Sequence, residues 1–311
     1  MFEKITGLHH VTMLSSSAVR SDAFYRESLG LRRVKKTVNR DAPDGYKLFY
    51  GNVHGTSGTL VSAVPFANLP RSTPGTGEVS TTVFSVGPGA LSRWRDHLAS
   101  RSVPVIGRDE LFGSNRMLFE GPDGETLAFQ VTHDERVPHA WGGMDAEYAI
   151  RGLHSVSVRV ADAKPMNELL ALLGFSESER HANVARFTLP TERRNGAHFL
   201  DVEEIVGGSA CRPGAGSVHR LALAVPDHGA MIEARDALMN EGHTVSDPID
   251  RQYFESVIVR GPENLLLEIA TDGSGFATDE TEATFGERLS LPPSLAGERE
   301  RLEAALEPLG S

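Results

Sequence analysis

One short pattern occurs three times along the chain: an apolar strand follows a glycine and leads toward a helix that ends near another glycine. It reads GLHHVTML at residues 7–14, GLHSVSVRV at 152–160 and GSVHRLALAV at 216–225. Internal similarity of this kind is typical of chains built from repeated supersecondary units. The repeat therefore limits the fold to architectures in which similar modules pack against one another.

Four modules account for the spacing of the repeats. Two units fit between Gly7 and Gly152, and one fits between Gly152 and Gly216. Each unit reads as a strand, an amphipathic helix and three further strands, which predicts an α+β fold of four βαβββ modules. The expected modules span 7–66 and 78–132 in a first half (1–146), and 150–206 and 216–271 in a second half (147–275), followed by a C-terminal tail at 276–311.

Local signals predict where several elements begin and end. The amphipathic segments predict helices at 18–29, 89–101, 164–175 and 228–242. Gly30 follows the first of these, at the position where a residue with positive φ commonly ends a helix. A hairpin is expected around Pro122, Asp123 and Gly124, which are typical turn residues between two apolar runs.

The composition favours a globular protein that acts on small molecules. Lys plus Arg is 31 and Asp plus Glu is 42, so the formal charge is −11, which argues against a nucleic-acid or anionic-membrane surface. The 311 residues, 40% of them hydrophobic, are enough to bury one or two large cores. Cys211 is the single cysteine, and no run is long enough for a signal peptide or a membrane span, so we expect a cytoplasmic protein.

Histidines and a glutamate occupy strand positions where a metal could bind. The first repeat carries His9 and His10, the last carries His219, and Glu268 stands inside the apolar run LLLEIA. Burying an ionised carboxylate among leucines is costly unless a cation offsets its charge. Two histidines and one carboxylate on neighbouring strands form the facial triad of non-haem Fe(II) proteins, which leaves coordination positions open.

Longer motifs surround these residues. They are FYRESLGLRRVKKTVN at 24–39, YKLFYGN at 46–52, GAGSVHRLALAVPD at 214–227, DRQYFESVIVR at 250–260 and LLLEIATDGSGFATDE at 265–280. With them the chain resembles the vicinal oxygen chelate superfamily, also called the glyoxalase, bleomycin-resistance and extradiol-dioxygenase superfamily. Within it, the chain looks like the ring-cleaving subfamily that includes hydroquinone dioxygenases, over nearly its whole length. The resemblance implies modules that pair into cup-like curved sheets, one of which holds a metal.

The resemblance implies that His10 and Glu268 are metal ligands. The third ligand position of the family is occupied by Arg220, whose guanidinium has no lone pair to offer a metal. Arg220 is therefore expected to form an ion pair with Glu268 or to bind an anionic ligand. His219 is the neighbouring candidate for the third ligand.

Strand alternation bears directly on His219. If Val218, Arg220, Ala222 and Ala224 face the cup, His219 faces away from it, because successive side chains of a strand point to opposite faces. Only a bulge or a one-residue slip of register would bring His219 to the metal.

Other matched positions imply substrate contacts and proton transfer. Arg251 corresponds to an arginine that contacts substrate, and Thr12 and His9 correspond to residues that line the pocket, with His9 as a possible proton carrier. The position of the family's acid–base tyrosine is Ile258. Tyr253, close by in the sequence, is the candidate replacement.

These assignments predict a ring-cleaving, Fe(II)-dependent dioxygenase that acts on hydroquinone- or catechol-type aromatics with dioxygen. Another divalent metal, or no metal, are the alternatives for the cofactor. The changes at Arg220 and Ile258 favour a second interpretation, a metal-free cup that binds a small aromatic or anionic molecule. A third is a metal-independent lyase, isomerase or hydrolase in which Arg220 is an electrophile and Glu268 a base.

His154, in the third repeat, is followed by Ser155 at the ligand position and is expected to be structural. The resemblance also makes a homo-oligomer plausible.

Overall fold

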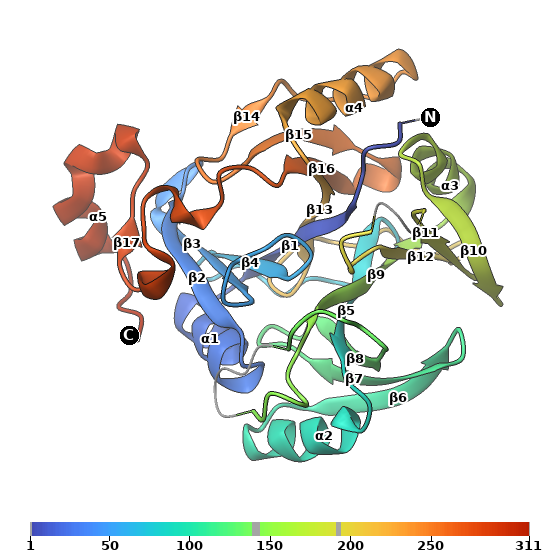
Figure 1. Cartoon of the computed structure of the whole chain (residues 1–311), viewed down its shortest axis with the longest axis horizontal. Helices are drawn as coiled ribbons and strands as arrows, with labels where there is room; N and C mark the ends of the chain where they lie inside the picture. The colour runs from blue at the N-terminus through green and yellow to red at the C-terminus, as the bar shows by residue number, and fades with distance from the viewer. Residues whose placement is uncertain (1, 139–143, 191–193, 311) are drawn as a thin grey trace.

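The computed structural model describes residues 2–138, 144–190 and 194–310. Two mixed β-sheets lie side by side, and the helices cover their outer faces (Figure 1). The first sheet contains β1 (Gly7–Ser15), β2 (Arg32–Asn39), β3 (Ala42–Gly51), β4 (Leu60–Pro65), β13 (Val218–Val225), β14 (Ile249–Asp250), β15 (Glu255–Arg260), β16 (Leu266–Thr271) and β17 (Leu289–Ser290). The second contains β5 (Glu78–Val86), β6 (Val105–Leu111), β7 (Ser114–Glu120), β8 (Thr126–Val131), β9 (Gly152–Val160), β10 (Ser176–His181), β11 (Val184–Thr188) and β12 (Phe199–Glu204).

The strand orders confirm the prediction of four βαβββ modules. The first sheet runs β14-β15-β16-β13-β1-β4-β3-β2-β17, so the first module lies beside the fourth. The second runs β10-β11-β12-β9-β5-β8-β7-β6, so the second module lies beside the third. Each sheet therefore draws one module from each of the two halves that the sequence suggests.

The helices agree closely with the amphipathic segments of the sequence. They are α1 (Ala18–Ala23), α2 (Ala90–Ser100), α3 (Ala163–Leu172), α4 (His228–Asn240) and α5 (Arg299–Ala305). The first differs in form, because α1 continues as the π-helical turn η1 (Phe24–Ser28) before Gly30 ends it at φ +65°. Asp227 caps α4 by accepting a hydrogen bond from the backbone N–H of Ala230 at 2.8 Å.

A β-bulge occurs at the same place in all four modules. The extra residue is His9 in β1, Ser80 in β5, His154 in β9 and His219 in β13. A bulge opposes two residues of one strand to one residue of the other, so it breaks the alternation of side chains. Strict alternation along the first strand of each module is therefore a wrong guide to which side chains face the cup.

Two groups of buried side chains fill the molecule. The larger runs through both sheets and under the helices. The smaller, which we call the cup cluster, lies on the face of the first sheet where β1 and β13 meet, and consists of Val34, Phe49, Leu60, Ala222, Tyr253, Phe254, Ala270, Phe276 and Phe285. Aromatic rings dominate it, so this face is shaped for flat apolar groups.

The C-terminal tail closes one side of the cup. β17 pairs with β2, and the tail contributes Phe276 and Phe285 to the cup cluster. Lys35 of β2 is fully buried and forms ion pairs with Asp279, at 2.6 Å, and with Glu280. In Figure 1 the red tail lies against β2 and β3. The predicted tail is thus part of the site's wall.

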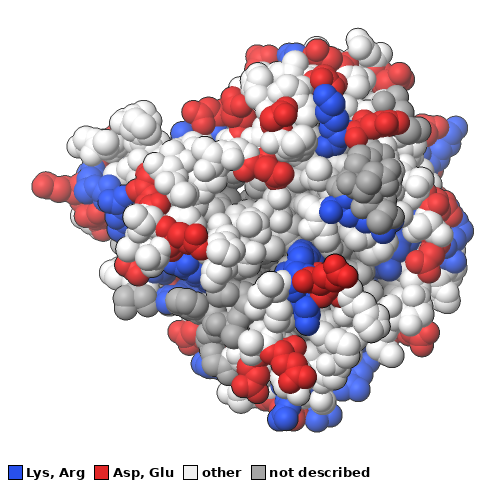
Figure 2. All heavy atoms as spheres, viewed as in Figure 1, with Lys and Arg blue, Asp and Glu red and all other residues white. Residues whose placement is uncertain are grey.

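The surface carries charges of both signs. Acidic and basic side chains are intermixed over the face shown in Figure 2, without a continuous basic patch there. Within the described residues, no helix has both the length and the apolar character needed to cross a bilayer.

Candidate active site

His10 and Glu268 lie on either side of β13. In the register of the sheet, Ala222 pairs with His10 on one side and with Glu268 on the other. The small side chain of Ala222 leaves the space between them open, and His10 Nε2 lies 3.7 Å from Glu268 Oε2. Both side chains are almost completely buried. Neither His10 Nε2 nor either Glu268 oxygen has a hydrogen-bond partner.

The neighbouring histidine determines which nitrogen of His10 carries the proton. His9 Nε2 lies 3.2 Å from the carbonyl oxygen of Thr271, which can only accept, so Nε2 of His9 donates. His9 Nδ1 then accepts from Nδ1 of His10 at 2.9 Å. The lone pair of neutral His10 is therefore on Nε2, which faces the carboxylate. A ligating histidine usually donates its other ring N–H in just this way.

The charges around Glu268 keep it ionised. Burial alone would raise its pKa, but the attraction of His10 and of the surrounding cationic side chains outweighs burial and leaves the pKa below its usual value. Burial lowers the pKa of His10 well below its ordinary value, and His9 lowers it further. An imidazole nitrogen and a carboxylate that face one small space without hydrogen-bond partners are suited to a cation.

Arg251, and not Arg220, forms the ion pair with Glu268. Its Nε lies 3.4 Å from Glu268 Oε1 and also donates to Ser256 Oγ at 3.2 Å. The ion pair expected between Arg220 and Glu268 is therefore wrong. Arg251 lies in the turn before β15, and β15 is the strand that pairs with β16, which carries Glu268.

His219 and Val218 occupy different places from those that alternation predicts. Because His219 is the extra residue of the bulge, Val218 packs against the larger core, whereas Ala222 faces the cup cluster. His219 is half-buried. Burial and the positive charge of Arg220 hold its pKa below the ordinary value, because they outweigh the opposite effect of Glu268. The imidazole thus lies within electrostatic reach of the cup.

The remaining predicted residues have defined positions. Ile258 pairs directly with Glu268 in the β15–β16 register, so an aliphatic side chain stands beside the carboxylate. Tyr253 is buried in the cup cluster, and its hydroxyl donates to Asp279 Oδ2 at 3.0 Å. The Oγ1 of Thr12 accepts from Ser62 Oγ at 2.8 Å, and Thr12 pairs with Arg220 across the two central strands. The tail residue Asp279 thus holds the hydroxyl of Tyr253, whose side chain lines both cavities described below.

His154 has an equivalent place in the other sheet. Its Nδ1 lies 3.1 Å from Ser155 Oγ, and burial holds its pKa well below the ordinary value. In the register, Asp201 takes the place of Glu268, and its carboxylate is paired with Arg186 at 2.7 Å. The second sheet thus has a hydrogen-bonded ion pair at 2.7 Å, whereas Glu268 in the first sheet has an ion pair at 3.4 Å and no hydrogen bond.

Two cavities are lined by neighbours of the His10–Glu268 pair. One of about 310 Å³ is lined by His9, Leu60, Phe254, Phe276 and Asp272 among others, and is large enough for a single aromatic ring. The other, about 30 Å³, is lined mainly by polar groups, among which are Lys47, Arg220, Arg251 and Tyr253. The rings of Phe49 and Phe254 lie over His10, with centroids 6.2 Å and 5.4 Å from the imidazole.

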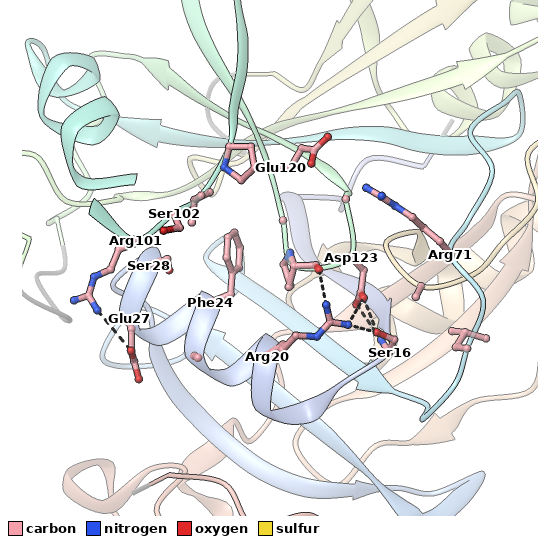
Figure 3. A pocket seen from close by; sticks show the side chains of 18 residues that line it. Ser16, Arg20, Phe24, Glu27, Ser28, Arg71, Arg101, Ser102, Glu120 and Asp123 are labelled. Atoms are coloured by element: carbon pink, nitrogen blue, oxygen red, sulfur yellow. Dashed lines mark hydrogen bonds and ion pairs between the residues drawn. The ribbon is translucent and has the colours of Figure 1, made fainter. Parts of the chain in front are cut away.

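A larger hollow lies away from this chemistry. It has a volume of about 710 Å³ and lies between α1 and the β7–β8 hairpin, with Arg20, Arg71 and Asp123 on its walls. Figure 3 shows Arg20 directed toward Asp123 and Ser16, where it forms an ion pair at 3.0 Å. Its charged side chains include two ion pairs, Arg20 with Asp123 and Arg101 with Glu27. The largest volume therefore does not coincide with the buried unpartnered groups, and size alone does not identify the active site.

Sequence reasoning missed Lys47 and the two phenylalanines beside His10, Phe49 and Phe254. Lys47 lies over the ring of Phe49 at 5.0 Å, and burial lowers its pKa to about 7. The signal was present, since alternation in YKLFYG places Lys47 and Phe49 on one face. That face belongs to the site only because β3 folds beside β4 and β1.

The residues of the cup fit a divalent metal as two ligands. The observation that supports this fit is that Nε2 of His10 faces the oxygens of Glu268, and that none of these atoms has a hydrogen-bond partner. In the part of the chain that the structure describes, no three His, Cys, Asp or Glu side chains come together as a metal site. The third position of the triad is held by Arg220, so the described residues offer two candidate ligands facing each other, His10 and Glu268.

The fold and this site define a class of protein, in which paired βαβββ modules form a cup with a buried histidine and a buried carboxylate near its central strands. A sequence model of the Glyoxalase/Bleomycin resistance protein/Dioxygenase superfamily matches residues 7–129. Glyoxalase I from Zea mays shares the fold, with a TM-score of 0.64 at 13% identity over 86% of this chain and 92% of that one. A crystal structure of a protein provisionally called a dioxygenase from Bacillus subtilis has a TM-score of 0.94 at 29% identity, over 99% of this chain and 98% of that one.

Full-length relatives carry more specific names. The protein provisionally named ring-cleaving dioxygenase MhqA, from Bacillus subtilis, is 32% identical over 98% of this chain and 99% of its own length. Chlorohydroquinone/hydroquinone 1,2-dioxygenase of Sphingobium indicum is 31% identical over 96% of this chain and 95% of its own. The chain belongs to the glyoxalase/bleomycin resistance protein/dioxygenase superfamily, and to its ring-cleaving, hydroquinone-dioxygenase-like branch. The predictions of the superfamily and of an enzyme are confirmed at this level.

Proposed function

We propose that the cup is the active site of a ring-cleaving dioxygenase that acts on hydroquinone- or catechol-type aromatics and uses Fe(II). The observation that carries the proposal is the buried pair of His10 and Glu268, whose lone pairs face each other without a donor between them. The names of the full-length relatives support the reaction class. A bound divalent metal would supply Lewis-acid activation of an aromatic diol and a path for electrons to dioxygen.

Each residue of the cup has a distinct role in this proposal. His10 and Glu268 hold the metal, and His219, displaced by the bulge, is the candidate for a third ligand. His9 fixes the tautomer of His10 through the 2.9 Å hydrogen bond and, at the wall of the larger cavity, is placed to carry a proton. Arg251 stabilises negative charge on a phenolate oxygen.

The aromatic side chains position the ring of the substrate. Phe49 and Phe254 present their rings next to His10, and their ring centroids lie 6.5 Å apart. Thr12 lines the floor of the cup beside Arg220. Tyr253 contributes its ring to the wall, while its hydroxyl is engaged by Asp279.

The experiment that tests the proposal is the iron content of anaerobically purified protein reconstituted with Fe(II), measured with His10→Ala and Glu268→Ala variants. We expect about one iron per chain, lost in both variants, together with oxygen consumption and loss of aromatic absorbance when hydroquinone is added. The control is His154→Ala, which removes a buried histidine of the other sheet, at the position that corresponds to His9. A protein that binds no iron under these conditions would contradict the proposal and favour the metal-free interpretation.

A further inference from the structure

Arg220 is a buried cation whose nearest electrostatic counter-charge, Glu268, already forms an ion pair with Arg251. It is 9% exposed, and among the residues that the structure describes it makes no hydrogen bond and no ion pair. Leaving a buried charged donor unsatisfied is costly, and guanidinium stays protonated when buried. The arrangement implies that an anionic acceptor belongs next to Arg220.

The surroundings of Arg220 carry an excess of positive charge. The small cavity is lined by Arg220, Arg251, Lys47 and Arg40, against a single lining carboxylate, Asp41. Glu268 lies beneath them, and its ion pair with Arg251 leaves Nη2 of Arg251 unpartnered. Arg40 already donates to the carbonyl oxygen of Asp250. The unused donors of the cavity thus come from Arg220, Arg251 and Lys47.

The size of this cavity selects the anion. The cavity of about 30 Å³ is narrow, so a planar carboxylate fits it better than the bulkier tetrahedral phosphate or sulfate. Arg binds carboxylates through paired, charge-assisted hydrogen bonds. The cavity therefore suits one carboxylate group.

The position of Arg220 in the sheet sets how far this carboxylate lies from His10 and Glu268, where the ring would react. Thr12 pairs with Arg220, and His10 is two residues from Thr12 on the same strand. Two residues of strand span about 7 Å, which is comparable to a benzene ring with its substituents. A ring held under Phe49 and Phe254 could direct its hydroxyl oxygens to His10 and Glu268 and a carboxylate to Arg220.

We propose that the substrate is an aromatic diol that carries a carboxylate on its ring, and that Arg220 binds this carboxylate with support from Lys47. The inference rests on the proposed function for the reacting hydroxyl groups. It assigns Arg220, in the place of a third metal ligand, to substrate recognition. Neutral hydroquinone is then a poorer ligand than its carboxylated counterpart.

Paired ligands that differ only in charge test the inference. Binding of 4-hydroxybenzoate and of its neutral isostere 4-hydroxybenzamide is measured by calorimetry, with metal-reconstituted and with chelator-treated protein. We expect the acid to bind at least tenfold more tightly than the amide, and the difference to disappear in Arg220→Gln. Arg220→Lys keeps the charge and should retain part of the preference. Equal affinity for acid and amide in the unmodified protein would overturn the inference.

Controls separate this result from a general effect of charge or of folding. Arg71→Gln removes one positive charge from the separate hollow of Figure 3 and should leave the preference unchanged. Affinity for the amide reports whether Arg220→Gln keeps an intact cup. Acetate that binds as tightly as 4-hydroxybenzoate would also overturn the inference, because the cavity would then be a site for a free anion. Turnover of hydroquinone without any preference for the acid would leave the proposed dioxygenase function standing and remove only the carboxylate.

Discussion

The imidazole Nε2 of His10 and the carboxylate Oε2 of Glu268 face each other across Ala222 at 3.7 Å, and neither atom has a hydrogen-bond partner. In the other sheet, the equivalent carboxylate of Asp201 is neutralised by Arg186. In the second sheet the buried carboxylate accepts two hydrogen bonds from Arg186, whereas the 3.4 Å ion pair with Arg251 leaves Glu268 without a hydrogen bond. The unpartnered lone pairs of His10 and Glu268, rather than the fold, distinguish this cup from the other sheet.

Glu268→Gln should destabilise the metal-free protein. The substitution keeps the shape of the side chain but leaves Arg251 and its cationic neighbours without their shared buried carboxylate, at a cost of about 3 kcal/mol in the free energy of unfolding. Urea unfolding of the chelator-treated protein measures the change. In the double variant with Arg251→Gln much of the loss should be recovered, and strictly additive losses would show that the two side chains do not interact.

Arg220→His should strengthen metal binding. It places an imidazole at the position that corresponds to His10 in the opposite module and removes a positive charge from beside the metal, so affinity for Co(II) should rise roughly tenfold or more. The d–d absorption of bound Co(II) follows the titration. Arg220→Gln is the control, since it removes the charge without adding a ligand. Equal gains in the two variants would assign the effect to charge alone.

Tyr253→Phe should lower stability more than turnover. Its hydroxyl donates to the carboxylate of Asp279, and losing a hydrogen bond to a charged group costs about 2 kcal/mol. We expect a lower midpoint of urea unfolding and less than a tenfold fall in kcat. A fall of several hundredfold with unchanged stability would instead identify the hydroxyl as the acid or base of the reaction.

Glu125 should make stability depend on pH. Burial raises its pKa to about 7, although the carboxylate accepts a hydrogen bond from the backbone N–H of Asp123 at 3.0 Å. The folded state then binds a proton that the unfolded state has already lost between about pH 4.5 and 7, so this contribution to stability is present at low pH and lost as the pH rises. Glu125→Gln mimics the neutral form. The stability difference between the variant and the unmodified protein should grow in favour of the variant from pH 5 to pH 8, as measured by urea unfolding, and a constant difference would contradict the assignment.

The sequence by itself determined the four modules and singled out His10 and Glu268 as candidate ligands. The repeated glycine–strand pattern and the helix periodicity depend on local preferences, and Glu268 stood out because a carboxylate inside an apolar strand needs a cation. The tertiary structure alone decided which charges meet. Whether His219 follows strand alternation depends on a bulge set by the pairing of β1 with β13, two strands that are about two hundred residues apart in the chain. Arg251 rather than Arg220 reaches Glu268, and Lys47 enters the site. These contacts depend on which strands pair in the folded sheet, and the local sequence of a strand does not specify its partner.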